Sequence, residues 1–173
     1  DTPLDSDGDG ICDFNDVLSV IYGTGDFELL QGQRNVSLQP IVTGMTVDIW
    51  EITPALPYGL FFGGDTMART SSGNGTIYGV PLVPSNLTEY TVTATNLLIG
   101  TQISTTFNLS IEEDYDLDGL PNNNTRLGLL EVDLDDDGDG FNDTFELECG
   151  GDPYNRSSVP KIESDGTCYT YRA

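Results

Sequence analysis

The sequence predicts an all-β fold: a β-sandwich flanked at both ends by irregular, Asp-rich loops. Short apolar–polar alternations fill the middle of the chain, and Gly, Pro and Asn turns separate them at intervals of about ten residues. Acidic residues gather at the two ends, and the 173 residues, 37% of them hydrophobic, suffice for one modest core. We expect three parts: an N-terminal loop over 1–18, a sandwich over 19–112 and tandem C-terminal loops over 113–173.

The strand pattern is clearest at residues 103–111, where Ile103, Phe107 and Ile111 fall on one face and Asn108 on the other. Residues 90–95 and 45–52 alternate in the same way, and Gly73-Asn74-Gly75 is a hairpin-turn signal. Two sheets packed face to face would bury the apolar faces. The expected core residues are Trp50, Leu60, Tyr90, Val92 and Phe107.

The order of four segments in this region is familiar. They are PALPYGLFF (54–62), GTIYGVP (75–81), YTVTATN (90–96) and FNLSI (107–111). Together they resemble the immunoglobulin-like, cadherin-like modules repeated in bacterial and archaeal surface proteins, over nearly all of 19–112. The resemblance implies an immunoglobulin-like β-sandwich with a structural or adhesive role, and it carries over no catalytic residues.

Charge is distributed unevenly along the chain. Residues 1–16 carry 6 acids and no base, residues 17–111 carry 6 acids and 2 bases, and residues 112–173 carry 17 acids and 4 bases. The net charge of -23 excludes nucleic acid as an ordinary partner and argues against an anionic membrane surface. No apolar run is long enough to span a membrane, and the absence of His excludes His-based catalysis and His-ligated metals.

The spacing of the acids predicts cation-binding loops. Residues 5–16 (DSDGDGICDFND) and 135–146 (DDDGDGFNDTFE) both place oxygen side chains at positions 1, 3, 5, 9 and 12, with Gly after position 5. Position 7 would donate its backbone carbonyl. The predicted ligands are Asp5, Asp7, Asp9, the carbonyl of Ile11, Asp13 and Asp16 in the first loop, and Asp135, Asp137, Asp139, the carbonyl of Phe141, Asp143 and Glu146 in the second.

A weaker copy occupies residues 114–125 (DYDLDGLPNNNT). Its predicted ligands are Asp114, Asp116, Asp118, the carbonyl of Leu120 and Asn122; because Thr125 is a poor ligand at position 12, a later residue such as Asp133 would complete the site. Residues 163–168 (ESDGTC) are a fourth trace that we do not expect to bind alone. The alternative is a solvated, disordered acidic tail.

Oxygen-only ligands without His favour calcium over zinc or copper, and magnesium rarely uses an all-protein cage. The loops lack flanking helices, and we expect no helix after Asp16. Residues 1–16 and 114–168, including the CGGDP segment, resemble the thrombospondin type-3 repeat and related spacers of surface proteins. That resemblance implies a calcium-stiffened linker.

Asn-x-Ser/Thr acceptors for N-linked glycans occur seven times, where chance gives about two. They predict a heavily N-glycosylated extracellular protein; the alternative is that Asn and Thr are simply frequent in β-rich surface proteins. The acceptors are Asn35, Asn74, Asn86, Asn108, Asn123, Asn142 and Asn155.

The three cysteines bear on assembly. In the resembling spacers, a Cys before GxDP pairs with a Cys after the next Asp-rich loop, which implies a Cys149–Cys168 disulfide; a reduced pair is the alternative. Cys12 is then left over, and its segment DSDGDGIC lacks the CGGDP half that the C-terminal region supplies. The complementary ends indicate either copies docking head to tail into a filament or one repeat of a longer stalk.

These observations favour an extracellular structural protein: a calcium-stabilised, glycosylated subunit of a surface filament, stalk or surface layer. The alternative is a calcium-dependent adhesin or carbohydrate-binding module, whose contact aromatics would be Tyr58, Phe61 and Phe62, or Tyr169 and Tyr171. For these aromatics we favour packing in the core or docking between subunits. We do not expect an enzyme, because no Ser, Cys or Lys stands in a recognisable nucleophile context and the cation loops use most carboxylates.

Overall fold

The computed structural model describes residue 5 and residues 19–170, apart from residues 24, 45, 64–72, 124 and 129–130. The elements are β1 (Ser19–Ile21), β2 (Phe27–Leu30), β3 (Val36–Leu38), β4 (Ile41–Thr43), β5 (Ile49–Thr53), β6 (Leu60–Phe62), β7 (Ile77–Gly79), β8 (Ser85–Asn96), β9 (Thr101–Glu112), α1 (Asp143–Glu148), β10 (Lys161–Ile162) and β11 (Cys168–Tyr169). Among the described residues, no helix has the length and apolar character needed to cross a membrane.

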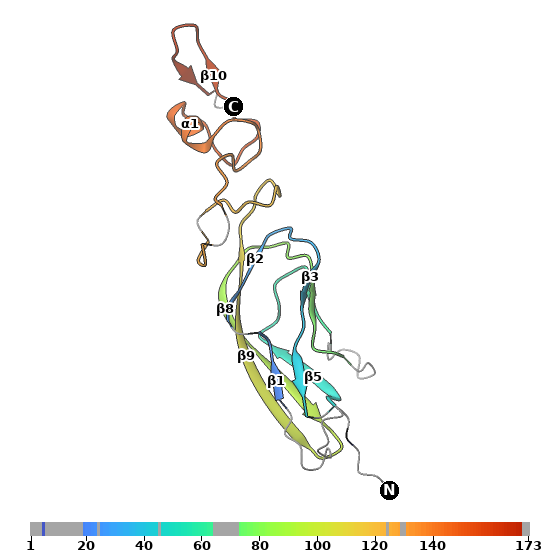
Figure 1. Cartoon of the computed structure of the whole chain (residues 1–173). Helices are drawn as coiled ribbons and strands as arrows, with labels where there is room; N and C mark the ends of the chain where they lie inside the picture. The colour runs from blue at the N-terminus through green and yellow to red at the C-terminus, as the bar shows by residue number, and fades with distance from the viewer. Residues whose placement is uncertain are drawn as a thin grey trace.

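Two sheets form the sandwich (Figure 1). One has the order β2-β9-β8-β5, with β2 parallel to β9 and the other pairs antiparallel; the other has the order β3-β7-β6. A separate pair, β1-β4, lies beside them. In the strand lettering of the immunoglobulin fold, β9, β8 and β5 correspond to strands G, F and C, and β3, β7 and β6 correspond to strands B, E and D. The fold is therefore an all-β, immunoglobulin-like sandwich, as predicted.

The core lies between the two sheets and contains all five predicted residues, Trp50, Leu60, Tyr90, Val92 and Phe107. Trp50 is on β5, the position of the buried Trp of immunoglobulin domains. The Phe107 ring contacts Tyr22 at 5.0 Å and Tyr90 at 5.6 Å between ring centroids. Aromatic rings of this size bury much apolar surface, so this cluster contributes strongly to the core.

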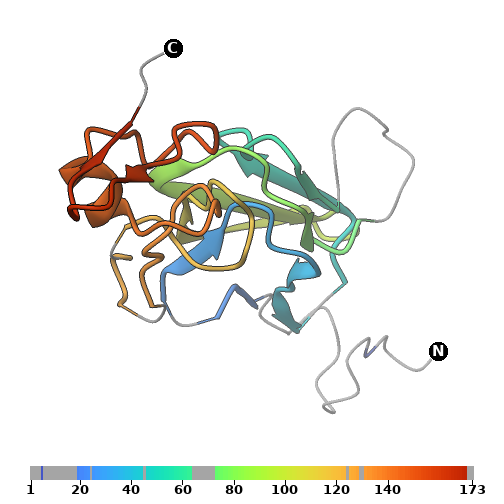
Figure 2. The same ribbon diagram turned by 90° about the horizontal axis from the view of Figure 1, so that it is seen from above.

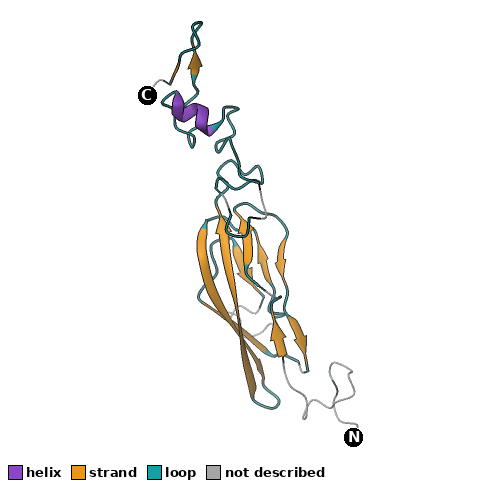
Figure 3. Ribbon diagram, turned by 60° about the vertical axis from the view of Figure 1, so that its left-hand side comes forward, coloured by secondary structure: helices purple, strands orange, loops and turns teal. Residues whose placement is uncertain are grey.

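The molecule is elongated, with the sandwich at one end and the β10–β11 hairpin at the other (Figures 1 and 3). The strand β9 leads straight into the loop segment, whose coils stack above the sandwich. Figure 2, turned by 90°, looks along this long direction. The predicted boundary at residue 112 coincides with the last residue of β9.

Contrary to expectation, the C-terminal loops contain a short helix, α1. Asn142 caps it by accepting a hydrogen bond from the Thr144 amide, and Asp143 and Glu146 lie in the first turn, where the helix dipole favours acids. The helix ends where Gly151 N donates to Glu146 O and Gly150 N to Leu147 O. That ending explains the two glycines of the CGGDP segment. Six residues are too few to show helical periodicity in the sequence.

Candidate metal centre

The second predicted loop, residues 135–146, gathers its acids as expected. Carboxylate oxygens of Asp135, Asp137 and Asp139 all lie within 4.8 Å of one another. The backbone curls around them: Gly140 N donates to Asp135 Oδ2 at 2.9 Å, and Phe141 N donates to Asp139 Oδ1 at 2.9 Å. Asp139 N also donates to Asp135 Oδ1 and Asp137 Oδ1, whereas Oδ2 of Asp137 and Oδ2 of Asp139 are buried without a hydrogen-bond partner among the described residues. The arrangement could hold a metal ion.

Glu146 closes this loop from helix α1. Its side chain is 0% exposed, and neither carboxylate oxygen has a hydrogen-bond partner among the residues that the structure describes. Burial, and then the charges of Asp139 and Asp137, raise the pKa of Glu146 to about 7. A buried carboxylate surrounded by like charges is costly unless a cation binds it. The residue at position 12 therefore fits a cation site through its chemistry as well as its spacing.

The loop at residues 114–122 repeats this geometry. Carboxylate oxygens of Asp114, Asp116 and Asp118 lie within 4.8 Å of one another. Four hydrogen bonds from a backbone N–H to a side-chain oxygen recur at equivalent positions of the two loops. The amide of position 6 donates to the side chain of position 1, that of 5 to 3, that of 7 to 5, and that of 2 to 9. In this loop they are Gly119 N to Asp114 at 3.1 Å, Asp118 N to Asp116 at 3.0 Å, Leu120 N to Asp118 at 2.8 Å and Tyr115 N to Asn122 Oδ1 at 2.9 Å.

Thr125 does not take the role of Glu146, since its hydroxyl accepts a hydrogen bond from Gly128 N at 3.1 Å. Asp133 lies close enough to Asp116 for its charge to contribute to the raised pKa of Asp116, after the effects of burial and of Asp118. Oδ2 of Asp133 is buried and has no hydrogen-bond partner within the described part of the chain. A buried oxygen without a partner suits a completing ligand, but that role of Asp133 stays a prediction.

The two loops are stacked against each other. A Cβ at Gly138 would meet the Asp116 carboxylate and would lie 2.6 Å from Arg156 Nη2. Arg156 donates from Nε to the Asp137 carbonyl at 2.9 Å and from Nη2 to the Gly138 carbonyl at 3.0 Å. Sequence analysis missed Arg156, because a single exposed Arg that is 19 residues from the nearer of the two acids it approaches, Asp137 and Asp116, gives no pattern. Its charge acts on both Asp116 and Asp137.

The first of the stacked loops also contacts the sandwich. Leu117 packs on Gly32, because a Cβ added at Gly32 would lie only 2.9 Å from Leu117 Cδ2. Arg126 forms an ion pair with Asp26 at 2.9 Å, and Leu127 N lies 3.2 Å from both carboxylate oxygens of Glu28. These contacts fix the direction in which the loops leave the sandwich.

Other predicted positions are placed as follows. For the N-terminal loop, only Asp5 lies within the described residues; Asp7, Asp9, Ile11, Asp13 and Asp16, and also Cys12, lie outside them. Residues 163–168 form the tip of the β10–β11 hairpin, where Asp165 accepts hydrogen bonds from Thr167. Cys149 and Cys168 form a disulfide with a Cα–Cα distance of 5.1 Å. Disulfide bonds are typical of an oxidising, extracellular environment.

The predicted sugar acceptors are exposed with one exception. Asn108 is half-buried on β9, and its Nδ2 donates to Asp26 Oδ1 at 2.8 Å. Asn142 is the N-cap of α1, which leaves its side chain exposed beside the metal loop. The exposed acceptors are Asn35, Asn74, Asn86, Asn123, Asn142 and Asn155.

Of the candidate contact aromatics, Tyr58 and Phe61 are exposed, whereas Phe62 packs in the core, which is one of the alternatives given for these side chains. Adjacent residues of β6 point to opposite faces, so Phe61 and Phe62 cannot both be exposed. Phe61 lies 5.8 Å from the ring of Tyr78 on the neighbouring strand. Tyr169 is half-buried, and Tyr171 lies outside the described residues.

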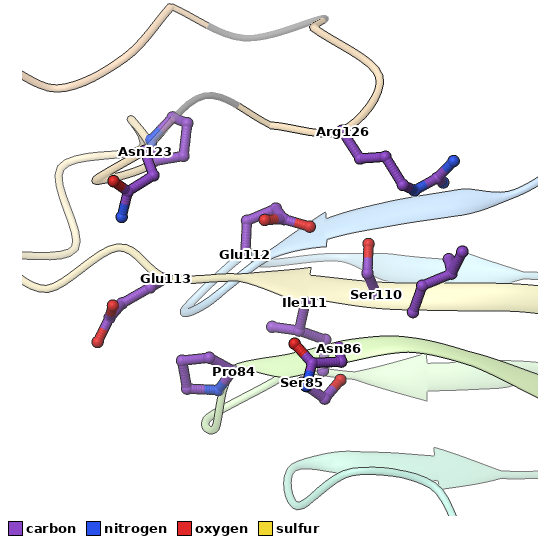
Figure 4. Close-up of a pocket in the computed structure, with 11 residues that line it drawn as sticks. Pro84, Ser85, Asn86, Ser110, Ile111, Glu112, Glu113, Asn123 and Arg126 are labelled. Carbon is purple, nitrogen blue, oxygen red and sulfur yellow. The ribbon is translucent and has the colours of Figure 1, made fainter.

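A pocket of about 540 Å³ lies where the loop around residues 121–126 overhangs β8 and β9 (Figure 4). Its lining includes the acceptors Asn86 and Asn123, together with Arg126. The Ser85 and Ser110 hydroxyls face this region and have no hydrogen-bond partner in the described ranges. The overhang explains why Ser110, on the polar face of its strand, is buried.

A pH dependence follows from the raised pKa of Glu146. In metal-free protein, the folded state binds this proton more tightly than the unfolded state, whose Glu has its ordinary pKa of 4.5. The resulting stability is fully present below about pH 4.5 and is lost as the pH rises through about 7. In metal-free protein the C-terminal loops should therefore be unfolded at pH 7 and gain protection against amide hydrogen exchange at pH 5, after correction for the intrinsic pH dependence of exchange.

The matched variants for this measurement are Glu146→Gln and Glu148→Gln, since Glu148 is exposed on the same helix. Glu146→Gln should flatten part of the pH dependence, and Glu148→Gln should leave it unchanged. Equal stability of the wild-type loops across this pH range would contradict the prediction.

Two titin domains are among the solved structures to which this chain is similar. The titin M10 domain in complex with obscurin-like 1 is 15% identical, covers 57% of this chain and 96% of its own, and has a TM-score of 0.38. The titin M3 domain is 20% identical, with coverages of 56% and 99% and a TM-score of 0.35. No protein-family model and no curated protein sequence matches the chain. The immunoglobulin-like assignment therefore rests on the strand order.

Proposed function

We propose that this protein is a calcium-stabilised, N-glycosylated structural subunit that assembles head to tail into an extracellular filament, stalk or surface layer. The proposal depends on one observation: the two stacked loops bury carboxylate oxygens for which the described residues offer no hydrogen-bond partner. Calcium fits best because it takes about six to eight oxygen ligands in adaptable geometry, whereas magnesium keeps several waters.

The loops would act as a stiff joint. The backbone of β9 continues into the first loop, Arg126 and Leu127 tie that loop to β2 and its neighbours, and Gly138 packs on Asp116 of the preceding loop. Ions bound in both loops would remove the repulsion that otherwise separates these acids. A rigid, elongated unit suits a structural role better than a calcium switch, which needs a helix pair that opens.

Head-to-tail assembly would join two segments that resemble the two halves of one spacer. They are the CGGDP segment, which lies beside the Cys149–Cys168 disulfide, and DSDGDGIC at residues 5–12. Electron microscopy of the native material before and after chelation tests the proposal. We expect ordered polymers in calcium that loosen or dissolve in chelator; a monomer that is indifferent to chelation would contradict it.

The glycans lead to a graded prediction. The six exposed acceptors should carry glycans at high occupancy, and Asn108 at the lowest occupancy. Asn108 is half-buried, its amide nitrogen donates to Asp26, and Ser110, the third residue of its acceptor tripeptide, is buried. Intact glycopeptide mass spectrometry of the native protein measures these occupancies. Full glycan occupancy at Asn108, or the absence of glycans from all seven acceptors, would contradict this prediction.

A second candidate is a carbohydrate-binding or adhesive module. The pocket beside Ser85 and Ser110 supports it, since unpartnered hydroxyls among the described residues, with Arg126 and Glu112, suit the hydroxyl groups of a sugar. The exposed Phe61–Tyr78 pair could stack on a sugar ring. Specific, saturable binding on a glycan array, lost in Ser110→Val but retained in Ser104→Val, would favour this candidate over a purely structural one.

A further inference from the structure

The pocket between the ends of β8 and β9 and the loop that overhangs them combines polar and apolar groups (Figure 4). Its volume of about 540 Å³ lies within the range of about 300–1,000 Å³ that is usual for small-molecule pockets. Pro84 and Pro121 line it with apolar surface, and Glu112 and Arg126 line it with charge. Ser110, also in the lining, is only 2% exposed, and its hydroxyl has no hydrogen-bond partner among the described residues. A buried hydroxyl of this kind is costly unless a further group binds it.

The pairing of β8 with β9 places the sugar acceptor Asn86 next to Ser110. The register shifts between Ser85 and Thr88, so Asn86 and Leu87 both lie opposite a single residue of β9, which is Ser110. Register shifts of this kind redirect side chains. Asn86 is exposed, and within the described part of the chain its side-chain amide has no hydrogen-bond partner; only its backbone carbonyl accepts, from Thr88 Oγ1 at 2.9 Å. The nitrogen that would carry a glycan is therefore available at the edge of the pocket.

The overhanging loop, residues 121–126, is held over the pocket at two points. Near its start, Asn122 N donates to the Glu113 carbonyl at 2.9 Å, and at its end Arg126 Nη1 lies 2.9 Å from Asp26 Oδ2. Residues of the two strands and of this loop line the same pocket. A group bound there would therefore contact the sandwich on one side and the loop on the other.

We propose that this pocket holds the first sugar residue of the N-linked glycan attached to Asn86. A pyranose has hydroxyls that donate and accept hydrogen bonds, which suits Glu112, Arg126 and the Ser110 hydroxyl, and its C–H face suits the prolines of the lining. The inference rests on the proposed N-glycosylation and gives one glycan a specific role. Bound between β9 and the overhanging loop, this sugar fixes the start of the Asp-rich segment on the sandwich.

Amide hydrogen exchange of the glycosylated full chain, read on peptides that span residues 121–128, tests the inference. Asn86→Gln loses the glycan and should exchange about tenfold faster there than wild type, because the loop loses its hydrogen bonds to the sugar. Thr88→Ser keeps the acceptor tripeptide and should exchange as wild type does. Ser157→Ala removes the acceptor at Asn155, which does not line the pocket, and should also match wild type.

The outcomes separate this inference from the proposed function. Equal exchange in Asn86→Gln and wild type, with a glycan on wild-type Asn86 shown by glycopeptide mass spectrometry, overturns the inference and leaves the proposed glycosylation intact. A bare Asn86 beside glycans at other acceptors overturns the inference alone. The absence of glycans from all seven acceptors overturns both.

If Asn86→Gln does not fold, two measurements on the wild-type glycoprotein still test the inference. A density map of the native material should show the first sugar of the Asn86 glycan between Ser110 and Arg126; a glycan that leaves directly into solvent, or the Asn123 glycan in its place, overturns the inference. A glycan array distinguishes the chain's own sugar from a foreign one. The glycosylated chain should bind no free saccharide at this pocket, and saturable binding that Ser110→Val abolishes overturns the inference.

Discussion

Chelation of calcium should unfold residues 113–170 while the sandwich stays folded. Without the ion, Asp114, Asp137 and Glu146 remain buried at 2%, 2% and 0% exposure among like charges. Each unpaired buried carboxylate costs several kcal/mol, roughly, so a few of them exceed the marginal stability of a domain of about 5–15 kcal/mol. Within the described part of 19–112, Val92 and Leu109 are fully buried and no charged side chain is buried.

Amide hydrogen exchange, read by peptide mass spectrometry, measures this outcome region by region. Protection over 113–170 should fall to that of an unfolded chain in chelator, and protection in β8 and β9 should persist. Calcium added back should restore the loops at lower concentration than magnesium, which dehydrates reluctantly. Unchanged protection in the loops after chelation would show that they do not depend on an ion.

Gly138→Ala should weaken the joint more than any comparable glycine substitution. Gly138 has φ 65°, which costs an L residue about 1–2 kcal/mol. The new Cβ would also displace the Asp116 carboxylate and Arg156 Nη2 from their present positions. Because Asp116 is a predicted ligand, both the thermal stability of the loops and their calcium affinity should fall.

The matched control is Gly128→Ala. Gly128 has a similar φ of 62°, but a Cβ there would meet nothing within 4 Å. Differential scanning calorimetry and calcium titration of the two variants separate backbone strain from the contact with Asp116. Equal losses in both variants would mean that the stacking of the two loops contributes nothing to calcium binding.

The parts of the fold that sequence reasoning recovers are those with short-range signals. The alternation over 103–111 identifies β9 and its inward face because strand side chains repeat every two residues. The spacing in DDDGDGFNDTFE places Asp135, Asp137, Asp139 and Glu146 together because the ligand order is written within twelve residues.

The remaining features depend on contacts between distant segments. The burial of Asp136 results from the approach of Tyr154 and of the preceding loop, and the sequence shows only one Asp more than the loop needs. The same holds for Ser110, covered by the overhang near Arg126, and for the parallel pairing of β2 with β9. Contacts between segments that are far apart in the sequence produce no periodic pattern of residues, so these features can be seen only in a structure.

The disulfide has a mechanical consequence. When the two ends of the molecule are pulled apart, tension that reaches Cys149 passes through the sulfur–sulfur bond to Cys168 and bypasses the residues between them. With a sequence separation of 19, the extended chain between the two cysteines would span about 65 Å, and the bridge prevents that extension. The molecule would therefore lengthen by that much less under load than a reduced chain.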